Sequence, residues 1–213
     1  MIIALAGQKG GSGKSTIAAS LADELHRRGH SVSVLDCDPQ GTLAVWKDHR
    51  PPDADGPTVL HSPKLLTEGS VESMRGAVQR LETRHVVIDA PPGTRRPQRA
   101  AMILADLAIL PCGPGYSDVW SLAETAELAQ GIQDKREGFR AKVLLKPADS
   151  RSVLTRKAKH ALSGFDLPTF DETLSYLVAY GETLGSGFGV TRYEPDSKAA
   201  REVRQLTDEV LSR

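Results

Sequence analysis

Residues Gly7 to Thr16 read GQKGGSGKST, and this stretch decides the fold. A short apolar run, Ile2 to Ala6, comes before it. After it, Ser15 to Arg28 carries apolar residues at helical spacing until Gly29 ends the pattern. A strand, a glycine-rich turn and a helix in this order are the setting of a phosphate-binding loop.

The residue types of this turn suit the binding of a phosphate chain. Glycines let the backbone curl so that successive N–H groups point at one anion, and a helix N-terminus adds partial positive charge. Lys14 can reach β- and γ-phosphates, and the Ser15 hydroxyl is placed to bind Mg²⁺. The common pattern G-x-x-x-x-G-K-[ST] has its first glycine at the position of Gln8, whereas Gly7 lies one residue earlier. Lys9 is an extra lysine that repels Lys14 unless phosphate is present.

Strand and helix candidates alternate through the rest of the chain. This alternation predicts an α/β fold with a mostly parallel, twisted sheet and helices on both faces. A length of 213 residues suits one domain, which we expect to cover residues 1–213. The other strand candidates are Ser31 to Leu35, Thr58 to His61, His85 to Asp89, Leu107 to Leu110 and Ala141 to Leu145, and the other helix candidates are Val71 to Leu81, Trp120 to Lys135, Ser152 to Leu162 and Ser197 to Leu211.

Composition narrows the classes of protein. The 27 basic and 27 acidic side chains give a formal net charge of zero, which excludes a globally basic nucleic-acid binder but not a local basic patch. Cys37 and Cys112 lack the spacing of a metal motif and fit a reducing cytosol. The N-terminus does not read as a signal peptide, and no apolar run approaches the length of a membrane span. We therefore expect a cytoplasmic protein without stable membrane insertion.

Three aspartates stand at or just after the ends of apolar strand candidates: Asp36, Asp38 and Asp89. The carboxyl ends of parallel strands meet at the crevice where ligands bind, so these side chains are expected near the phosphate loop. Asp89 is the candidate Mg²⁺ ligand. Asp36 either supports the metal shell or caps the end of its strand.

Three segments together resemble the ParA/MinD family. KGGSGKST at 9–16 resembles its deviant Walker A motif, and DCDPQG at 36–41 resembles its switch I segment. VIDAPPG at 87–93 resembles its Walker B motif and switch II. Residues 113–122 and 189–200 resemble the short ParA-like subgroup without an N-terminal DNA-binding extension. The resemblance covers nearly the whole chain and implies a P-loop NTPase fold and a slow, Mg²⁺-dependent, partner-stimulated ATP hydrolase.

The resemblance also assigns roles to residues. Lys9 becomes the signature lysine that reaches the nucleotide of a partner subunit, Lys14 the P-loop lysine, and Asp38 the residue that positions the attacking water. Mg²⁺ is assigned to Ser15, Asp36 and Asp89. The segment where the family often places an asparagine against adenine here reads LKPAD, with Lys146 and Pro147 as candidate base contacts. The expected ATP contacts in the loop are Lys9, Gly10, Gly11, Ser12, Gly13, Lys14, Ser15 and Thr16.

The partners implied by the resemblance are a second copy, DNA and a stimulating protein. Segment 134–160 contains nine basic and three acidic residues, which suits nonspecific DNA contacts and equally a solvated, salt-bridged face. The C-terminal helix candidate adds Lys198, Arg201 and Arg204. The resemblance implies an ATP-dependent homodimer that associates with the nucleoid and positions a plasmid, a chromosome region or a protein complex. A ParB-like or adaptor protein then stimulates hydrolysis through a basic N-terminal segment.

Three rival functions remain open at this point. A MinD-like membrane-associated ATPase needs a C-terminal amphipathic helix, whereas Val203, Leu206 and Val210 are spaced to pack on the protein's own core. The other two are a metabolic P-loop enzyme and a module that binds ATP without hydrolysing it. Outside the motifs, Arg95, Arg96 and Arg99 are either partner-reading residues or surface charge, and Trp46 and Trp120 are expected to be packing residues.

Overall fold

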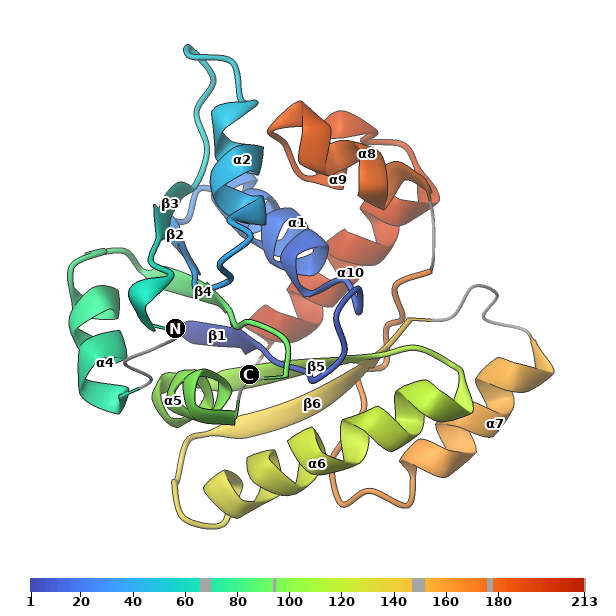
Figure 1. Ribbon diagram of the computed structural model, residues 1–213. Helices are drawn as coiled ribbons and strands as arrows, with labels where there is room; N and C mark the ends of the chain where they lie inside the picture. The colour runs from blue at the N-terminus through green and yellow to red at the C-terminus, as the bar shows by residue number, and fades with distance from the viewer. Residues whose placement is uncertain (66–69, 94, 147–151, 176–177, 213) are drawn as a thin grey trace.

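The computed structural model describes residues 1–65, 70–93, 95–146, 152–175 and 178–212. Within these ranges a six-stranded parallel sheet forms the centre, in the order β3-β2-β4-β1-β5-β6 (Figure 1). This arrangement confirms the predicted α/β class. The strands are β1 (Ile2–Leu5), β2 (Val32–Asp36), β3 (Thr58–His61), β4 (His85–Asp89), β5 (Leu107–Cys112) and β6 (Arg140–Leu145).

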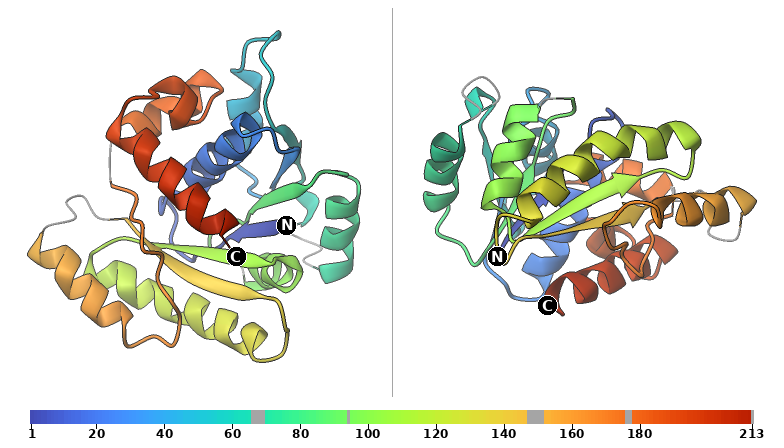
Figure 2. Two further views of the ribbon diagram at one scale, coloured as in Figure 1. Left: turned by 180° about the vertical axis from the view of Figure 1, so that it is seen from behind. Right: turned by 90° about the horizontal axis from the view of Figure 1, so that it is seen from below.

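Helices cover both faces of the sheet (Figures 1 and 2). One layer contains α1 (Lys14–Arg27), α2 (Thr42–Asp48), α8 (Val178–Ser186), α9 (Val190–Tyr193) and α10 (Lys198–Leu211). The opposite layer contains α4 (Val71–Gln79), α5 (Arg95–Leu104), α6 (Tyr116–Gln133) and α7 (Val153–Leu162).

The strands are apolar throughout because both of their faces are buried. In β1, Ile3 and Leu5 pack toward the layer of α1 and α10, whereas Ala4 packs toward the layer of α5 and α6. Successive side chains of a strand point to opposite faces, so a central strand between two helical layers has no polar face. This explains why the runs at 2–6 and 85–89 contain almost no alternation of apolar and polar residues.

The predicted strands are all present, but several helices were not predicted. Helices α2, α5, α8 and α9 escaped prediction, and α6 begins at Tyr116 rather than Trp120. The sequence of α5 starts RRPQR, where a proline suggests a loop; Pro97 lies in the first turn of the helix, where a missing N–H costs no hydrogen bond. Helix α8 contains Gly181 and Gly185, which lower its helix propensity.

None of the helices in the described part of the chain is both long enough and apolar enough to span a membrane.

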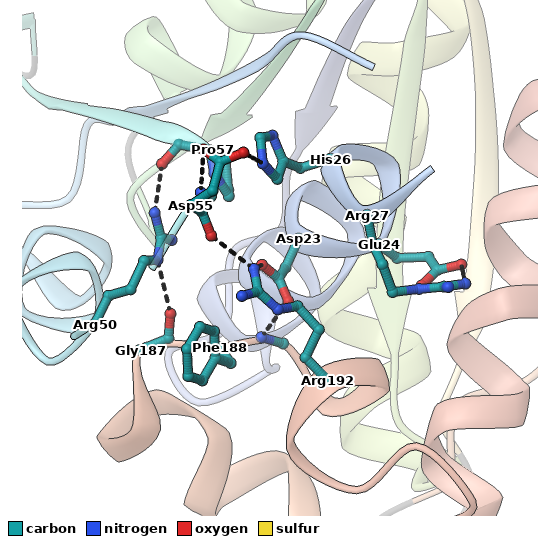
Figure 3. Close-up of polar contacts among 12 residues, drawn as sticks. Asp23, Glu24, His26, Arg27, Arg50, Asp55, Pro57, Gly187, Phe188 and Arg192 are labelled. Atoms are coloured by element: carbon teal, nitrogen blue, oxygen red, sulfur yellow. Dashed lines mark hydrogen bonds and ion pairs between the residues drawn. The ribbon is translucent and has the colours of Figure 1, made fainter. Parts of the chain in front are cut away.

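A buried ion pair connects α1 to the turn between α8 and α9 (Figure 3). Asp23, completely buried on α1, accepts hydrogen bonds from the backbone N–H of Gly189 at 2.9 Å and from Arg192 at 3.2 Å. Arg192 also donates to the Asp55 carbonyl oxygen at 2.8 Å, and its guanidinium lies 4.2 Å from the centre of the Phe188 ring. A single aspartate therefore connects α1, α9 and, through Arg192, the loop before β3.

Arg50 makes a second connection beside the first (Figure 3). Its guanidinium donates to the carbonyl oxygens of Gly187 and Pro57, both at 3.1 Å, and lies over the ring of Trp46. The Trp46 indole is fully buried, as predicted, and donates to the Phe188 carbonyl oxygen at 3.1 Å. These contacts fix α2, which directly follows the DCDPQG segment, against the C-terminal part of the chain.

We expect Asp23→Ala to lower the free energy of unfolding by about 2–4 kcal/mol, because the buried Gly189 N–H and the Arg192 guanidinium lose their acceptor. The measurement is chemical denaturation followed by circular dichroism. Asp208→Ala is the matched control, because its ion pair with Arg28 is exposed and should contribute less than about 1 kcal/mol. Equal losses in the two variants would contradict the assigned importance of Asp23.

Candidate functional site

The turn between β1 and α1 leaves backbone donors free for an anion. Gly11 and Gly13 have φ angles of +75° and +86°, a region that favours glycine, and Gly13 is the residue before the first turn of α1. No side chain caps this helix N-terminus. The N–H groups of Gly11, Ser12 and Gly13 donate to no atom of the described residues. Such a turn suits phosphate oxygens.

Lys14 is buried beside this turn, with only 6% of its surface exposed. Its ammonium lies 3.4 Å from the Lys9 carbonyl oxygen. Burial lowers the pKa of Lys14, and the nearby Asp89 and Asp38 carboxylates oppose that shift. The predicted convergence of the P-loop lysine with the strand-end acids is therefore present.

Ser15 and Asp89 form the part of the site that fits a metal ion. The Ser15 hydroxyl donates to Asp89 Oδ2 at 2.6 Å, across 74 residues of sequence. Asp89 Oδ1 is buried and has no hydrogen-bond partner among the described residues. Burial raises the pKa of Asp89 to about 7. A buried carboxylate oxygen without a partner, next to a serine hydroxyl, matches the oxygen ligands that Mg²⁺ prefers.

Asp36 and Asp38 differ in what they contact. Asp36 is fully buried and accepts from the N–H groups of Asp38 at 3.0 Å, Leu43 at 3.1 Å and Ala44 at 3.4 Å. Through the Asp38 N–H it caps the end of its strand, the alternative that the sequence left open, and it also accepts from the first turn of α2, which was not predicted; its metal role stays a prediction. Asp38 is partly exposed and accepts from the N–H of Gln40 at 2.9 Å. Asp36 lies opposite Asp89 in the register of β2 and β4.

Lys9 extends from the loop toward α6. Its ammonium forms an ion pair with Asp118 at 2.5 Å, and 51% of its side chain is exposed. The neighbouring Gln8 donates to Glu124, also on α6. The two lysines of the loop therefore occupy different environments: Lys14 is enclosed beside carboxylates of the sheet, whereas Lys9 lies on the rim.

The candidate base contacts and Thr16 are placed as follows. Lys146 follows β6, and its ammonium donates to the Ser12 carbonyl oxygen at 2.9 Å, so it contacts the backbone of the loop. Pro147 lies outside the described residues. Thr16 is partly exposed in the first turn of α1.

Gln98 is a residue of this region that the sequence did not reveal. It is buried on α5, and its side-chain amide donates to the carbonyl oxygens of Gly7 at 3.0 Å and Pro91 at 2.9 Å. It therefore joins the start of the phosphate loop to the segment after β4. The only signal in the sequence was a glutamine within an arginine-rich run, which is too common to be diagnostic.

The prediction that Trp120 packs inside the protein is wrong. Trp120 is 75% exposed and Tyr116, one turn earlier on α6, is 57% exposed. Their rings lie 6.5 Å apart, on the same helical turns as Asp118. Tyr116 and Trp120 thus form an exposed aromatic pair on α6, and Asp118, two residues from each ring, points to a different side of this helix.

The basic residues of 134–160 do not form one face. Arg136 donates to the Ala105 carbonyl oxygen, Lys142 pairs with Glu209, and Lys146 lies against the phosphate loop. Arg151 lies outside the described residues. The unpaired cations concentrate on α7, where Arg156, Lys157 and Lys159 make no ion pair with any residue that the structure describes.

The C-terminal helix uses its apolar side in the core. Val203, Leu206 and Val210 on α10 are buried against α1 and the sheet, as predicted. Of its basic residues, Lys198 pairs with Glu202, whereas Arg201 and Arg204 donate to the carbonyl oxygens of Asp196 and Pro195. These contacts leave α10 no free apolar face for a membrane surface.

Comparison with known proteins agrees with this geometry. The family model of the CobQ/CobB/MinD/ParA nucleotide binding domain matches residues 3–211, so the chain belongs to this family. It is similar to maintenance of carboxysome distribution protein A of Halothiobacillus neapolitanus, with 27% identity over 98% of this chain and 95% of that protein. It is likewise 27% identical to the chromosome-partitioning ATPase Soj of Thermus thermophilus, over 99% and 95% of the two chains. The fold resembles that of the McdA–ATP complex of Cyanothece, with a TM-score of 0.73, 21% identity and coverage of 99% and 96%.

We expect Asp89→Asn to stabilise the nucleotide-free protein. Because burial raises the pKa of Asp89 to about 7, while the unfolded chain ionises near 4, the folded state loses stability between these pH values. Removing the charge should raise Tm by roughly 5–15 °C at pH 8, and the gain should vanish near pH 4. Thermal unfolding in EDTA measures this, with the exposed Asp53→Asn as control. A lower Tm at every pH would contradict the cost assigned to the buried charge.

Proposed function

We propose that this protein is a Mg²⁺-dependent ATPase that closes as a homodimer around ATP, holds cargo on DNA in that state and is reset by hydrolysis. The observation that carries the proposal is the set of Lys14, Ser15 and Asp89 around a turn with unpaired N–H groups. Such a set binds a triphosphate and a divalent cation together. The similar partitioning and carboxysome-distribution proteins support a role in positioning.

The proposed chemistry is phosphoryl transfer to water. The loop N–H groups and Lys14 bind the phosphates, Ser15 and Asp89 hold Mg²⁺, and Asp38 orients the attacking water. When bound, Mg²⁺ neutralises charge on the phosphate oxygens. Catalysis in this reaction class consists mainly of positioning and charge stabilisation, which this chain's own residues provide.

The contacts of Lys9 support the dimer. An exposed ion pair contributes at most about 1 kcal/mol, so Lys9 can leave Asp118 at low cost and reach a neighbouring nucleotide. Trp120 and Tyr116 are exposed on another side of α6, and exposed aromatic residues of this kind often anchor protein interfaces. A second copy would cover them when the dimer closes.

Helix α7 is the proposed DNA surface. Arg156, Lys157 and Lys159 are exposed, and the helix contains no acidic residue. Cations in this arrangement contact phosphates without reading bases. A dimer presents two such helices, which would make binding depend on nucleotide and place the protein on the nucleoid. The proposed stimulating partner is a ParB-like or adaptor protein with a basic N-terminal segment.

Hydrolysis and dimerisation test the roles of Lys14, Lys9 and Asp38. Lys14→Ala and Lys9→Ala should each lower kcat by roughly 100-fold or more, because each removes a positive charge from the transferred phosphate. Asp38→Ala should hydrolyse little ATP and remain a dimer, since water is no longer oriented. Steady-state phosphate release and light scattering after gel filtration measure these effects, with the exposed Lys47→Ala as control. Wild-type turnover in Asp38→Ala would contradict the assignment.

The dimer also has an optical signature. Trp46 is buried and Trp120 is exposed, so acrylamide quenching reports mainly on Trp120. ATP should protect Trp120 from quenching in Asp38→Ala, whereas the Lys9→Ala variant should show no protection.

DNA binding tests the role of the basic residues on α7. Replacing Arg156, Lys157 and Lys159 together by Gln should weaken nonspecific DNA binding in ATP about tenfold or more and flatten its salt dependence. Anisotropy with ATP, ADP and no nucleotide, at two salt concentrations, measures this. The same neutralisation of Arg75, Arg80 and Arg84, exposed beside the opposite edge of the sheet, is the control. Binding to anionic vesicles without binding to DNA would instead support a MinD-like membrane role.

A further inference from the structure

A third lysine contacts the phosphate loop from a distant part of the sequence. Lys146 directly follows β6, and its backbone N–H donates to the Cys112 carbonyl oxygen at 2.7 Å, which extends the pairing of β5 and β6 by one residue. This rigid base directs the side chain to the loop, where the ammonium donates to the Ser12 carbonyl oxygen at 2.9 Å. The approach is close, because a methyl group added at Gly13 would overlap the ammonium.

The charge of Lys146 has no acidic partner in the described part of the chain. Burial lowers the pKa of Lys146, and no carboxylate of the described residues opposes that shift. Lys14 differs, since Asp89 and Asp38 favour its charged form, and Lys9 differs because it pairs with Asp118. A partly buried cation whose contact is a neutral carbonyl costs free energy in the folded protein. An anion bound in the loop would offset that cost.

The carbonyl that Lys146 contacts belongs to a peptide unit with a free donor. In a trans peptide, the C=O of Ser12 and the N–H of Gly13 point in opposite directions. A cation on the carbonyl side therefore polarises the unit and strengthens the N–H as a donor on the far side. That N–H donates to no atom of the described residues, and the Ser12 hydroxyl is also buried without a partner. Both free groups belong to the turn that Lys146 fixes.

We propose that Lys146 is a positioning residue of the nucleotide site, which acts through the Ser12–Gly13 peptide rather than by touching the nucleotide. Its ammonium fixes the Gly13 turn and strengthens the Gly13 N–H that receives a phosphate oxygen. The inference rests on the proposed function, because it requires that the loop binds nucleotide. It replaces the expected role of Lys146 as a base contact.

The test is nucleotide affinity in Lys146→Met, which keeps the length of the side chain and removes its charge. ATP and ADP affinities should both fall about tenfold, since the loss of a charge-assisted hydrogen bond acts on the loop and not on one phosphate. Lys146→Arg should restore affinity to within about threefold of wild type. In the nucleotide-free protein, the Gly13 amide proton should move upfield in the NMR spectrum of Lys146→Met, and Tm should not fall.

Lys142→Met is the matched control, because Lys142 lies on β6 but pairs with Glu209. It should change neither the affinity nor the Gly13 resonance. Unchanged affinity in Lys146→Met would overturn the inference, as would a loss confined to ATP, which would indicate direct contact with the terminal phosphate. A fall in Tm without the upfield shift would also overturn it, because Lys146 would then be purely structural. If the wild type and Lys142→Met bind no nucleotide, the proposed function itself fails.

Discussion

The site depends on the balance of charge around the buried Lys14 ammonium. A lysine with 6% exposure must be held by carboxylates, and these come from the ends of β2 and β4. The sheet order places β4 between β2 and β1. Asp89, at the end of β4, therefore lies beside Leu5, the last residue of β1, and Asp36, at the end of β2, lies on its other side. The parallel sheet is therefore what allows a buried cation and a buried carboxylate to exist together. Both charges are only partly compensated, which would suit the phosphate chain and metal ion of the proposed function.

The parts of the site that could be predicted are those where local sequence has one physical solution. The positive φ angles of Gly11 and Gly13 favour glycine at these two positions of the turn before α1. Short runs that are apolar throughout, alternating with helix patterns, indicate strands of a parallel sheet that are buried on both faces. Long-range contacts carried no comparable signal. Lys146 reaches Ser12 across 134 residues and Gln98 reaches Gly7 across 91, and a lysine or a glutamine at those positions is ordinary in any loop or helix.

For the same reason, the charge pattern of 134–160 did not reveal which of its basic residues share a surface. Counting charges along the chain assumes that neighbours in sequence share a face, whereas β6 and α7 place theirs in different surroundings. Lys142 pairs with Glu209 from the last helix, and Arg136 donates to the Ala105 carbonyl oxygen, just before β5. Helices α5 and α8 were missed because proline and glycine lower helix propensity, although tertiary packing overrides it. In each case the deciding interaction came from an element distant in sequence.

The three lysines around the loop each lie beside a different kind of group. Lys14 is surrounded by sheet carboxylates, Lys9 by a carboxylate of α6, and Lys146 by a backbone carbonyl. The first is enclosed and cannot move far, whereas the second is half exposed and held by a weak, screened pair. The third has its base in the β5–β6 ladder, and among the described residues its ammonium donates to a backbone carbonyl alone. These environments would suit three tasks around one loop if the proposed function holds. The enclosed Lys14 would bind phosphate, the half-exposed Lys9 would be available to a second molecule, and Lys146 would shape the turn that both serve.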